Sequence, residues 1–233
     1  MNLPKLETPK YELIVPSTGK SVSYRPFLVK EEKILLIAQE SENEAALINA
    51  MKDIIASCTF GELSAGSLTA FDLEYIFIKI RSKSVGEESE IGIKCNSCGM
   101  MNTVVVNLDE IELPKVKPLP KKIQLTETIG IIPRHISVDK LAEISKAQNE
   151  GDTVIKTIAG AIESIYDEKD VYPVDEATES DVVEFVESLN KDHIEKIESV
   201  ISGAPEVAKT VQFTCSKCGE KNTTTLKGLQ NFF

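Results

Sequence analysis

The chain is poor in residue types on which several common functions depend. It has no tryptophan, and aromatic residues make up only 6% of its 233 residues, which argues against a platform that stacks nucleic-acid bases. Its two histidines are His135 and His193, and we expect both to be surface residues and not metal ligands. Catalytic zinc sites commonly include histidine and keep one coordination position open, so a catalytic zinc is not expected.

Long apolar runs are missing as well. No stretch approaches the roughly 18–20 apolar residues of a membrane-spanning helix, so no membrane span is expected. The first residues, MNLPKLETPKYELIV, lack the apolar region of a signal peptide. Together with five cysteines, this absence indicates a reducing compartment in which the thiols stay free.

Signatures of catalysis are also absent. The sequence has no glycine-rich phosphate loop, no G-x-S-x-G, no H-E-x-x-H and no G-x-G-x-x-G motif. Acidic residues are plentiful, but their spacing is typical of solvated helix faces. We therefore expect that the protein is not an enzyme and has no catalytic residues.

The charge balance narrows the choice of partners. With 37 acidic and 26 basic residues the formal net charge is -11, and such a surface repels phosphate backbones. Nucleic acid is therefore not an expected partner. One stretch of this acidic chain is basic, residues 112–122 (ELPKVKPLPKK), and its three prolines indicate an extended connector.

Four cysteines in two matched pairs are the most informative feature that is present. Cys95 and Cys98 stand in EIGIKCNSCGMMNTVVVNL, and Cys215 and Cys218 stand in TVQFTCSKCGEKNTTTLKG. In both copies an alternating stretch leads into Cys-x-x-Cys-Gly, and Asn and Thr then open a second extended run. This pattern is typical of a metal-binding knuckle on a β-hairpin, and two knuckles together supply the four thiolates of one structural zinc ion.

Two other interpretations of these cysteines stay open. In the first, the site has lost its metal, and the packing of the flanking residues keeps the fold. In the second, each pair is a thioredoxin-like redox pair, which has the same Cys-x-x-Cys spacing. The redox pair stands at the start of a helix, whereas both pairs here precede turn- and strand-forming residues. The fifth cysteine, Cys58, lies in a helical stretch, and we expect it to be a buried small apolar residue.

Periodicity predicts an α+β fold, with helices between two small β-hairpin zinc knuckles and an N-terminal β-hairpin. Alternation predicts that hairpin over residues 11–15 and 20–29, a helix is expected from Val29, and residues 123–132 resemble a single strand. The predicted inner faces of the other helices are Leu47, Met51, Ile54, Ile55 and Cys58; Leu73, Ile76, Phe77 and Ile80; Ile155, Ile158, Ile162 and Ile165; Val182, Phe185, Val186 and Leu189; and Ile194, Ile197 and Ile201.

The predicted organisation has three parts. Residues 1–111 hold the N-terminal hairpin, helices and the first knuckle, residues 112–122 form the Pro/Lys connector, and residues 123–233 form a helical half that ends in the second knuckle. The knuckles are expected to join into one zinc ribbon, which makes the zinc a clasp between distant parts of the chain.

The residues that carry a family resemblance run along nearly the whole chain. The opening PKYELIVPSTGKSVSYRPFLVKEEKILLIAQES, the paired knuckles, the ESDVVEFVESLN helix and the terminal GLQNFF resemble the T-even-type (myovirus) bacteriophage baseplate hub proteins. The resemblance implies a non-enzymatic hub subunit, or a factor that assembles the hub. It also implies other hub or tail proteins as partners, and a location in the virion tail baseplate or in the bacterial host cytoplasm during assembly. Whether the chain forms a homo-oligomer stays open.

Three questions follow from the residues themselves. Tyr24-Arg25-Pro26-Phe27 is either a contact surface or, as we favour, part of the core and the entry to a helix. The residues Phe232 and Phe233 either pack on their own core or insert into a partner.

A rival function is a zinc-ribbon adaptor acting on transcription machinery or nucleic acid, and a third is a metalloenzyme. The net charge argues against the adaptor, and the lack of an open zinc position argues against the enzyme.

Overall fold

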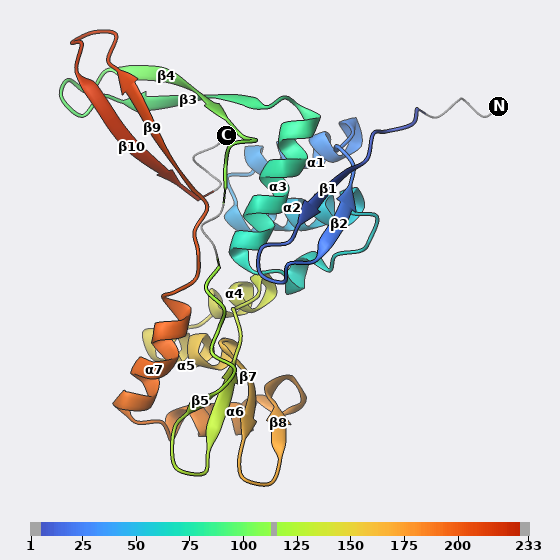
Figure 1. Cartoon of the computed structure of the whole chain (residues 1–233), viewed down its shortest axis with the longest axis vertical. Helices are drawn as coiled ribbons and strands as arrows, with labels where there is room; N and C mark the ends of the chain where they lie inside the picture. Colours follow the sequence, from blue (N-terminus) through green and yellow to red (C-terminus); the bar gives the residue numbers. More distant parts are fainter. Residues whose placement is uncertain (1–5, 113–115, 229–233) are drawn as a thin grey trace. The chain divides into compact units, whose positions relative to one another are not determined.

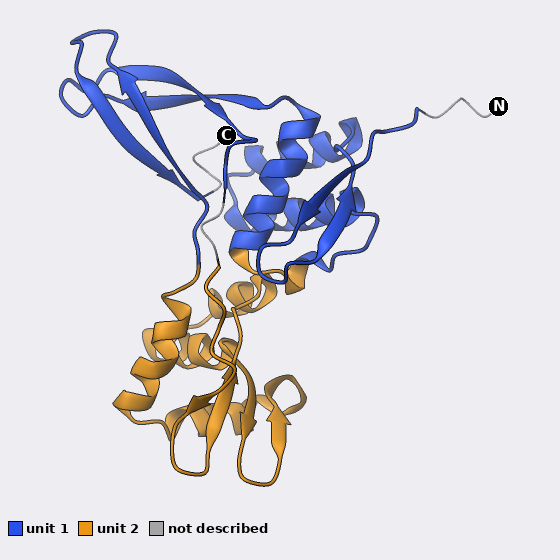
Figure 2. Ribbon diagram, in the orientation of Figure 1, with its two compact units in different colours: residues 1–65, 71–115, 205–233 blue, residues 66–70, 116–204 orange. Residues whose placement is uncertain are grey.

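The computed structural model describes residues 6–112 and 116–228, and the chain divides into two compact units (Figure 2). The first comprises residues 1–65, 71–115 and 205–233, and the second comprises residues 66–70 and 116–204. These units follow contacts in space, whereas the three parts expected from the sequence follow chain order. The terminal Phe232 and Phe233 lie outside the described residues.

The first unit begins with an antiparallel hairpin followed by helices. Strands β1 (Tyr11–Ile14) and β2 (Ser21–Tyr24) pair from Tyr11 opposite Tyr24 to Ile14 opposite Ser21. Helices α1 (Val29–Glu40), α2 (Glu44–Cys58) and α3 (Ala70–Ser84) follow, and α1 begins at the residue expected from the sequence. The predicted inner faces of α2 and α3 are buried, including Cys58, which has no exposed surface, except that Leu47 is only half-buried.

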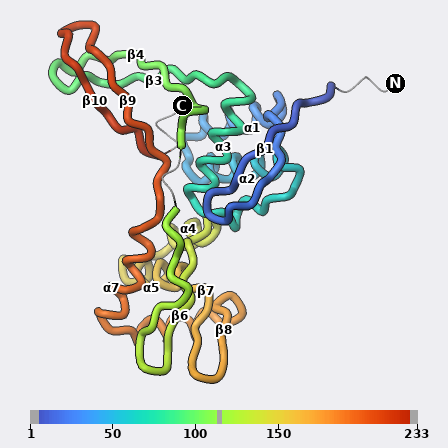
Figure 3. Tube along the Cα trace, in the orientation of Figure 1, coloured from blue at the N-terminus to red at the C-terminus, as the bar shows by residue number. Residues whose placement is uncertain are grey.

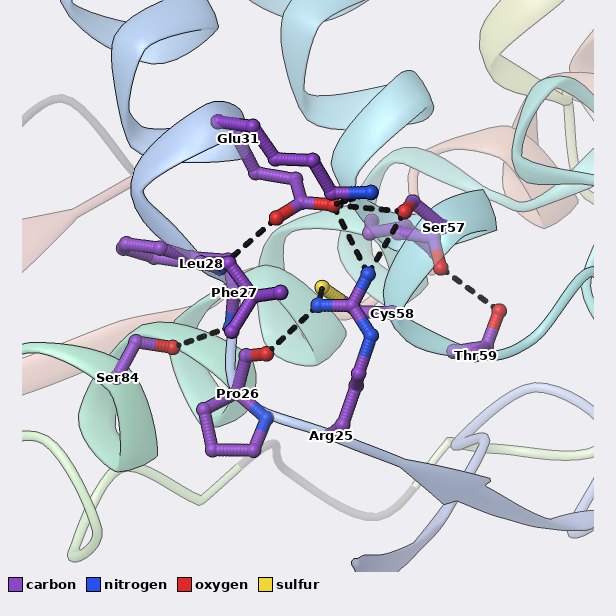
Figure 4. A network of polar contacts seen from close by, with 11 residues as sticks. Arg25, Pro26, Phe27, Leu28, Glu31, Ser57, Cys58, Thr59 and Ser84 are labelled. Atoms are coloured by element: carbon purple, nitrogen blue, oxygen red, sulfur yellow. Dashed lines mark hydrogen bonds and ion pairs between the residues drawn. The ribbon is translucent and has the colours of Figure 1, made fainter. Parts of the chain in front are cut away.

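A buried ion pair joins β2 to the two helices that follow it (Figure 4). The Arg25 guanidinium donates to Glu31 Oε1 and to Ser57 Oγ, at 2.9 Å each, and Glu31 Oε2 accepts from the backbone N–H of Leu28 at 2.8 Å. Arg25 is 8% exposed and Glu31 3%. Tyr24 and Phe27 are buried as well, which supports core and helix entry for this segment and not a contact surface.

Two long hairpins complete the first unit, one from the middle of the chain and one from its C-terminal part. Strands β3 (Glu88–Lys94) and β4 (Met101–Asn107) pair along seven residues, and so do β9 (Ala208–Thr214) and β10 (Lys221–Lys227). The tube in Figure 3 shows these green and red hairpins lying beside each other. The α+β class, the N-terminal hairpin and the two knuckle-bearing hairpins are therefore confirmed.

The second unit is a four-stranded antiparallel sheet with helices (Figure 1). Its strands, in the order β5-β6-β7-β8, are β5 (Ile123–Gln124), β6 (Gly130–Pro133), β7 (Ile162–Tyr166) and β8 (Val171–Pro173). Its helices are α4 (Val138–Ile144), α5 (Glu150–Gly160), α6 (Glu179–Glu187) and α7 (Lys191–Ile201). A core that includes Ile131, Ile158, Ile162 and Ile197 packs between sheet and helices.

Two predictions for this unit were wrong. Residues 123–132 form a hairpin of β5 and β6 and not one strand. The helix expected to carry Ile162 and Ile165 ends at Gly160, and both residues lie in β7, where Ile165 pairs with Ile131. By contrast, the expected helices at 179–187 and 191–201 are present, capped by Thr178 and Asn190. Within residues 6–112 and 116–228, none of the helices is both long and apolar enough to cross a membrane.

Candidate metal centre

The first knuckle is the tight turn that joins β3 to β4. The backbone N–H of Cys95 donates to the Met100 carbonyl at 2.8 Å, and the N–H of Gly99 donates to the Cys95 carbonyl at 3.0 Å. Gly99 has φ +69°, a left-handed conformation that glycine adopts without a steric cost. This glycine lets the chain leave the turn into β4 while the side chains of Cys95 and Cys98 project to one side.

The second knuckle repeats this geometry between β9 and β10. The N–H of Cys215 donates to the Glu220 carbonyl at 2.8 Å, and the N–H of Gly219, at φ +73°, donates to the Cys215 carbonyl at 3.0 Å. Each contact in one knuckle thus has its counterpart in the other, with residue numbers that differ by about 120. The matched sequence flanks therefore correspond to two copies of one local structure.

The two knuckles bring all four sulfur atoms to within 4.8 Å of one another. The Sγ atoms of Cys95 and Cys218 are 3.7 Å apart, and those of Cys98 and Cys215 are 3.6 Å apart. A tetrahedral zinc site with Zn–S bonds of about 2.3 Å has S···S edges of about 3.8 Å, whereas a disulfide has an S–S distance of about 2.05 Å. The spacing thus fits four thiolates around one metal ion and does not fit disulfides.

The four thiols differ in their exposure. Cys95 and Cys215, the first cysteine of each pair, are 2% exposed, whereas Cys98 and Cys218 are exposed. Each knuckle thus contributes one inner and one outer sulfur. An ion held by all four would have its inner side covered by protein and its outer side near solvent.

Two asparagines tie each knuckle to the other. Asn102 Nδ2 lies 3.7 Å from Cys215 Sγ, and Asn102 Oδ1 accepts from the backbone N–H of Ser216 at 2.9 Å. In the same way Asn222 Nδ2 lies 3.5 Å from Cys95 Sγ, and its Oδ1 accepts from the N–H of Asn96 at 2.9 Å. Each amide therefore donates to a sulfur and accepts from the backbone of the opposite knuckle. Partners of this kind orient metal ligands and favour their charged form.

These asparagines were not assigned a role from the sequence. The signal for them is that each stands four residues after the second cysteine of its pair, Asn102 after Cys98 and Asn222 after Cys218. Both are buried, at 7% and 3% exposure. Buried amides at one repeated position identify a structural requirement of the knuckle and not merely a turn residue.

The electrostatics of the cluster favour thiolates only in part. Backbone N–H groups of Cys98 and Ser97 lower the pKa of Cys95, and those of Cys218 and Lys217 outweigh burial and lower the pKa of Cys215 to about 6. For Cys218 the N–H of Glu220 also favours the thiolate, but the neighbouring sulfurs raise its pKa to about 12. Four sulfurs this close ionise together only when a cation offsets their repulsion.

The histidines lie elsewhere. His193 stands in the first turn of α7, where its Nδ1 accepts from the backbone N–H of Asn190 at 3.4 Å, and His135 follows β6. Both side chains are half-buried, and neither belongs to the four-sulfur cluster. A metal held by four thiolates has no open position for a reacting water, so this donor set suits a structural ion.

Comparison with known proteins gives the family. No curated protein and no solved structure matches the chain. The model of one protein family, described as T4 bacteriophage base plate protein, matches residues 8–233. This match spans both compact units and both knuckles, and it confirms the resemblance seen in the sequence at the level of the baseplate. The chain belongs to the T4 bacteriophage base plate protein family, a family of structural proteins of the phage tail.

Proposed function

We propose that Cys95, Cys98, Cys215 and Cys218 hold one structural zinc ion, and that the zinc-clasped protein is a non-enzymatic hub component or hub assembly factor of the phage baseplate. The observation that carries the zinc assignment is the spacing of four sulfurs from two hairpins about 120 residues apart in the chain. Their separations of 3.6 and 3.7 Å match the edges of a zinc–thiolate tetrahedron.

The zinc acts by joining two elements that are weak alone. An isolated two-stranded hairpin is marginally stable in water, and both knuckle-bearing hairpins are two-stranded. The two asparagine bridges link the hairpins directly. An ion pair of 3.1 Å also joins Lys209 of β9 to Glu110, in the segment that follows β4. Structural zinc sites have an apparent binding free energy on the order of 10 kcal/mol, and the part of it that stabilises the fold depends on the free zinc concentration.

The hub assignment rests on family membership and on the hub-like segments of the sequence. The matched family is one of baseplate proteins, so other tail proteins are the expected partners. Of the segments that resemble hub proteins, residues 11–41 form β1, β2 and α1 of the first unit. The zinc clasp fixes the fold of that same unit, and in this way presents a preformed surface to neighbouring hub proteins.

Native mass spectrometry of protein purified under reducing conditions tests the metal. We expect one zinc ion per chain, lost on treatment with a strong chelator and absent from Cys98→Ser, an exposed position where misfolding is least expected. Lys217→Ala, an exposed change between the two cysteines of the second knuckle, is the control and should keep the ion. A reduced wild-type chain without metal would overturn the clasp.

A pull-down from infected cells, compared with the protein content of purified virions, tests the hub role. Recovery of baseplate hub proteins supports the role, and presence in the virion or its absence separates a subunit from an assembly factor. Recovery only of transcription proteins or nucleic acid would favour the adaptor. The metal result and the partner result can fail independently.

A further inference from the structure

Helix α1 exposes more large apolar side chains than it buries. Four aliphatic residues of this short helix face solvent: Val29, Ile34, Leu36 and Ile37. Its opposite side packs inward through Glu31, Leu35 and Ala38. A helix at a protein surface normally carries its apolar residues on the inner side, so this outer side has the character of a contact surface.

The outer side has a regular pattern. Lys33, Leu36, Ile37 and Glu40 follow the i, i+3, i+4, i+7 spacing that places residues along one side of a helix. All four are exposed, and Leu36 and Ile37 are 52% and 57% exposed. This set, the α1 stripe, has an apolar centre, a cation at its N-terminal end and an anion at its C-terminal end.

We propose that the α1 stripe binds the α1 stripe of a second copy of this chain, with the two helices antiparallel. A two-fold axis that passes between Leu36 and Ile37 sets Leu36 of one copy against Ile37 of the other, and the reverse. The same axis sets Lys33 of each copy against Glu40 of the other. One apolar contact is thus flanked by two equivalent ion pairs.

Charge complementarity selects the second copy and the direction of pairing. Lys33 and Glu40 each lie three and a half residues from the axis, about 5 Å along the helix, which is within reach of their long side chains. Parallel helices would instead set Lys33 against Lys33 and Glu40 against Glu40, and like charges repel. The stripe therefore complements itself only in the antiparallel arrangement.

The size of the stripe sets the expected strength. One face of a helix of 12 residues covers less than the roughly 1,200 Å² of a standard stable interface. We therefore expect a weak dimer, with a dissociation constant between about 10 μM and about 1 mM. The pairing uses none of the metal centre, so it stands or falls separately from the zinc clasp.

Sedimentation velocity of the full chain from about 1 μM to about 500 μM tests the proposal. The wild type should shift from monomer to dimer over this range. Lys33→Glu and Glu40→Lys each convert both ion pairs of the dimer into repulsions, so each should weaken association by about tenfold. Lys20→Glu, an equal change of charge at an exposed turn residue outside α1, is the matched control and should leave association unchanged.

Mixing the two variants gives the sharpest result. A dimer of one Lys33→Glu chain with one Glu40→Lys chain has Glu opposite Lys at both contacts, so the mixture should associate as the wild type does. The double variant should do so as well. Leu36→Asn should abolish association, whereas Val154→Asn, at a comparably exposed residue of α5, should not.

Three outcomes would overturn the proposal. A wild-type chain that stays monomeric at the highest concentration excludes the dimer. Association that is insensitive to Leu36→Asn places the contact elsewhere. Single variants that are weakened but not rescued by mixing exclude the reciprocal antiparallel pairing. Circular dichroism of each variant verifies folding, and all the substituted side chains are exposed.

Discussion

Replacing Cys215 by serine should loosen a hairpin that precedes it by more than a hundred residues. Cys215 is 2% exposed, lies 3.6 Å from Cys98 Sγ and accepts a hydrogen bond from Asn102 of the first hairpin. Cys215→Ser removes one of the four thiolates and replaces the sulfur that accepts from this amide with the oxygen of a shorter side chain. When the free zinc concentration is about 1,000 times the dissociation constant of the wild type, loss of zinc binding lowers the unfolding free energy by about 4 kcal/mol.

Hydrogen exchange of the zinc-loaded protein measures where this loss falls. In the proposed clasp the ion joins both hairpins, so amides of β3 and β4 should lose protection together with those of β9 and β10. Thr225→Ser, an exposed change in β10 that keeps the hydroxyl, is the matched control and should alter neither hairpin. Loss of protection confined to residues 208–227 would refute the argument that the cysteines form one clasp.

Three further predictions concern the asparagine bridges, the buried ion pair and the core of the second unit. Asn102→Ala and Asn222→Ala should each weaken zinc retention about 10–100-fold in competition with a chromogenic chelator, whereas Asn96→Ala, which keeps its backbone donor, should not. Burial opposes the charge of Glu31, but hydrogen bonds from Arg25, Leu28 and Ser57 lower its pKa to about 2. Its charge therefore stabilises the fold above pH of about 4.5, and Glu31→Gln should lower the unfolding free energy by about 3 kcal/mol at pH 7. In denaturation curves, the difference in unfolding free energy between wild type and Glu31→Gln should disappear as the pH falls from about 4.5 to about 2. A difference of equal size at pH 7 and at pH of about 2 would contradict this account. Glu32→Gln, at an exposed position, is the control. Ile197→Ala should cost about 2–5 kcal/mol in the same assay because Ile197 is fully buried in the second unit, against little change for Val154→Ala.

The cluster of four cysteines could be predicted because the same local sequence pattern occurs twice. Two Cys-x-x-Cys-Gly turns with alternating flanks define two hairpins, and the structure brings their sulfurs together. The cross-bridging role of Asn102 and Asn222 could not be read in the same way. An asparagine after a turn is expected on local grounds alone, and its partners here, Ser216 and Asn96, belong to the opposite hairpin.

Strand β7 of the second unit was predicted as part of a helix because its isoleucines follow helical spacing. Ile155, Ile158, Ile162 and Ile165 fit one helical face, yet the helix ends at Gly160 and the last two residues belong to β7. Short apolar runs do not separate helix from strand by periodicity alone. What decides between them is pairing with β6 and β8, whose residues lie up to about 40 positions away in the chain.

The position of the second unit between the two knuckles bears on how the clasp closes. About 116 residues separate Cys98 from Cys215, and residues 116–204 of this interval belong to the second unit. Once that unit has folded, it acts as a rigid insert in the loop between the two cysteines. Only about 27 residues of the loop then still vary in conformation. The free-energy cost of loop closure grows as three-halves of RT times the logarithm of loop length. With the span of the folded unit neglected, shortening the loop from about 116 to about 27 residues lowers this cost by about 1.3 kcal/mol. If the proposed clasp is correct, we expect zinc to bind most readily to a chain whose second unit is already folded. A core change such as Ile197→Ala should then slow zinc uptake during refolding as well as lower stability.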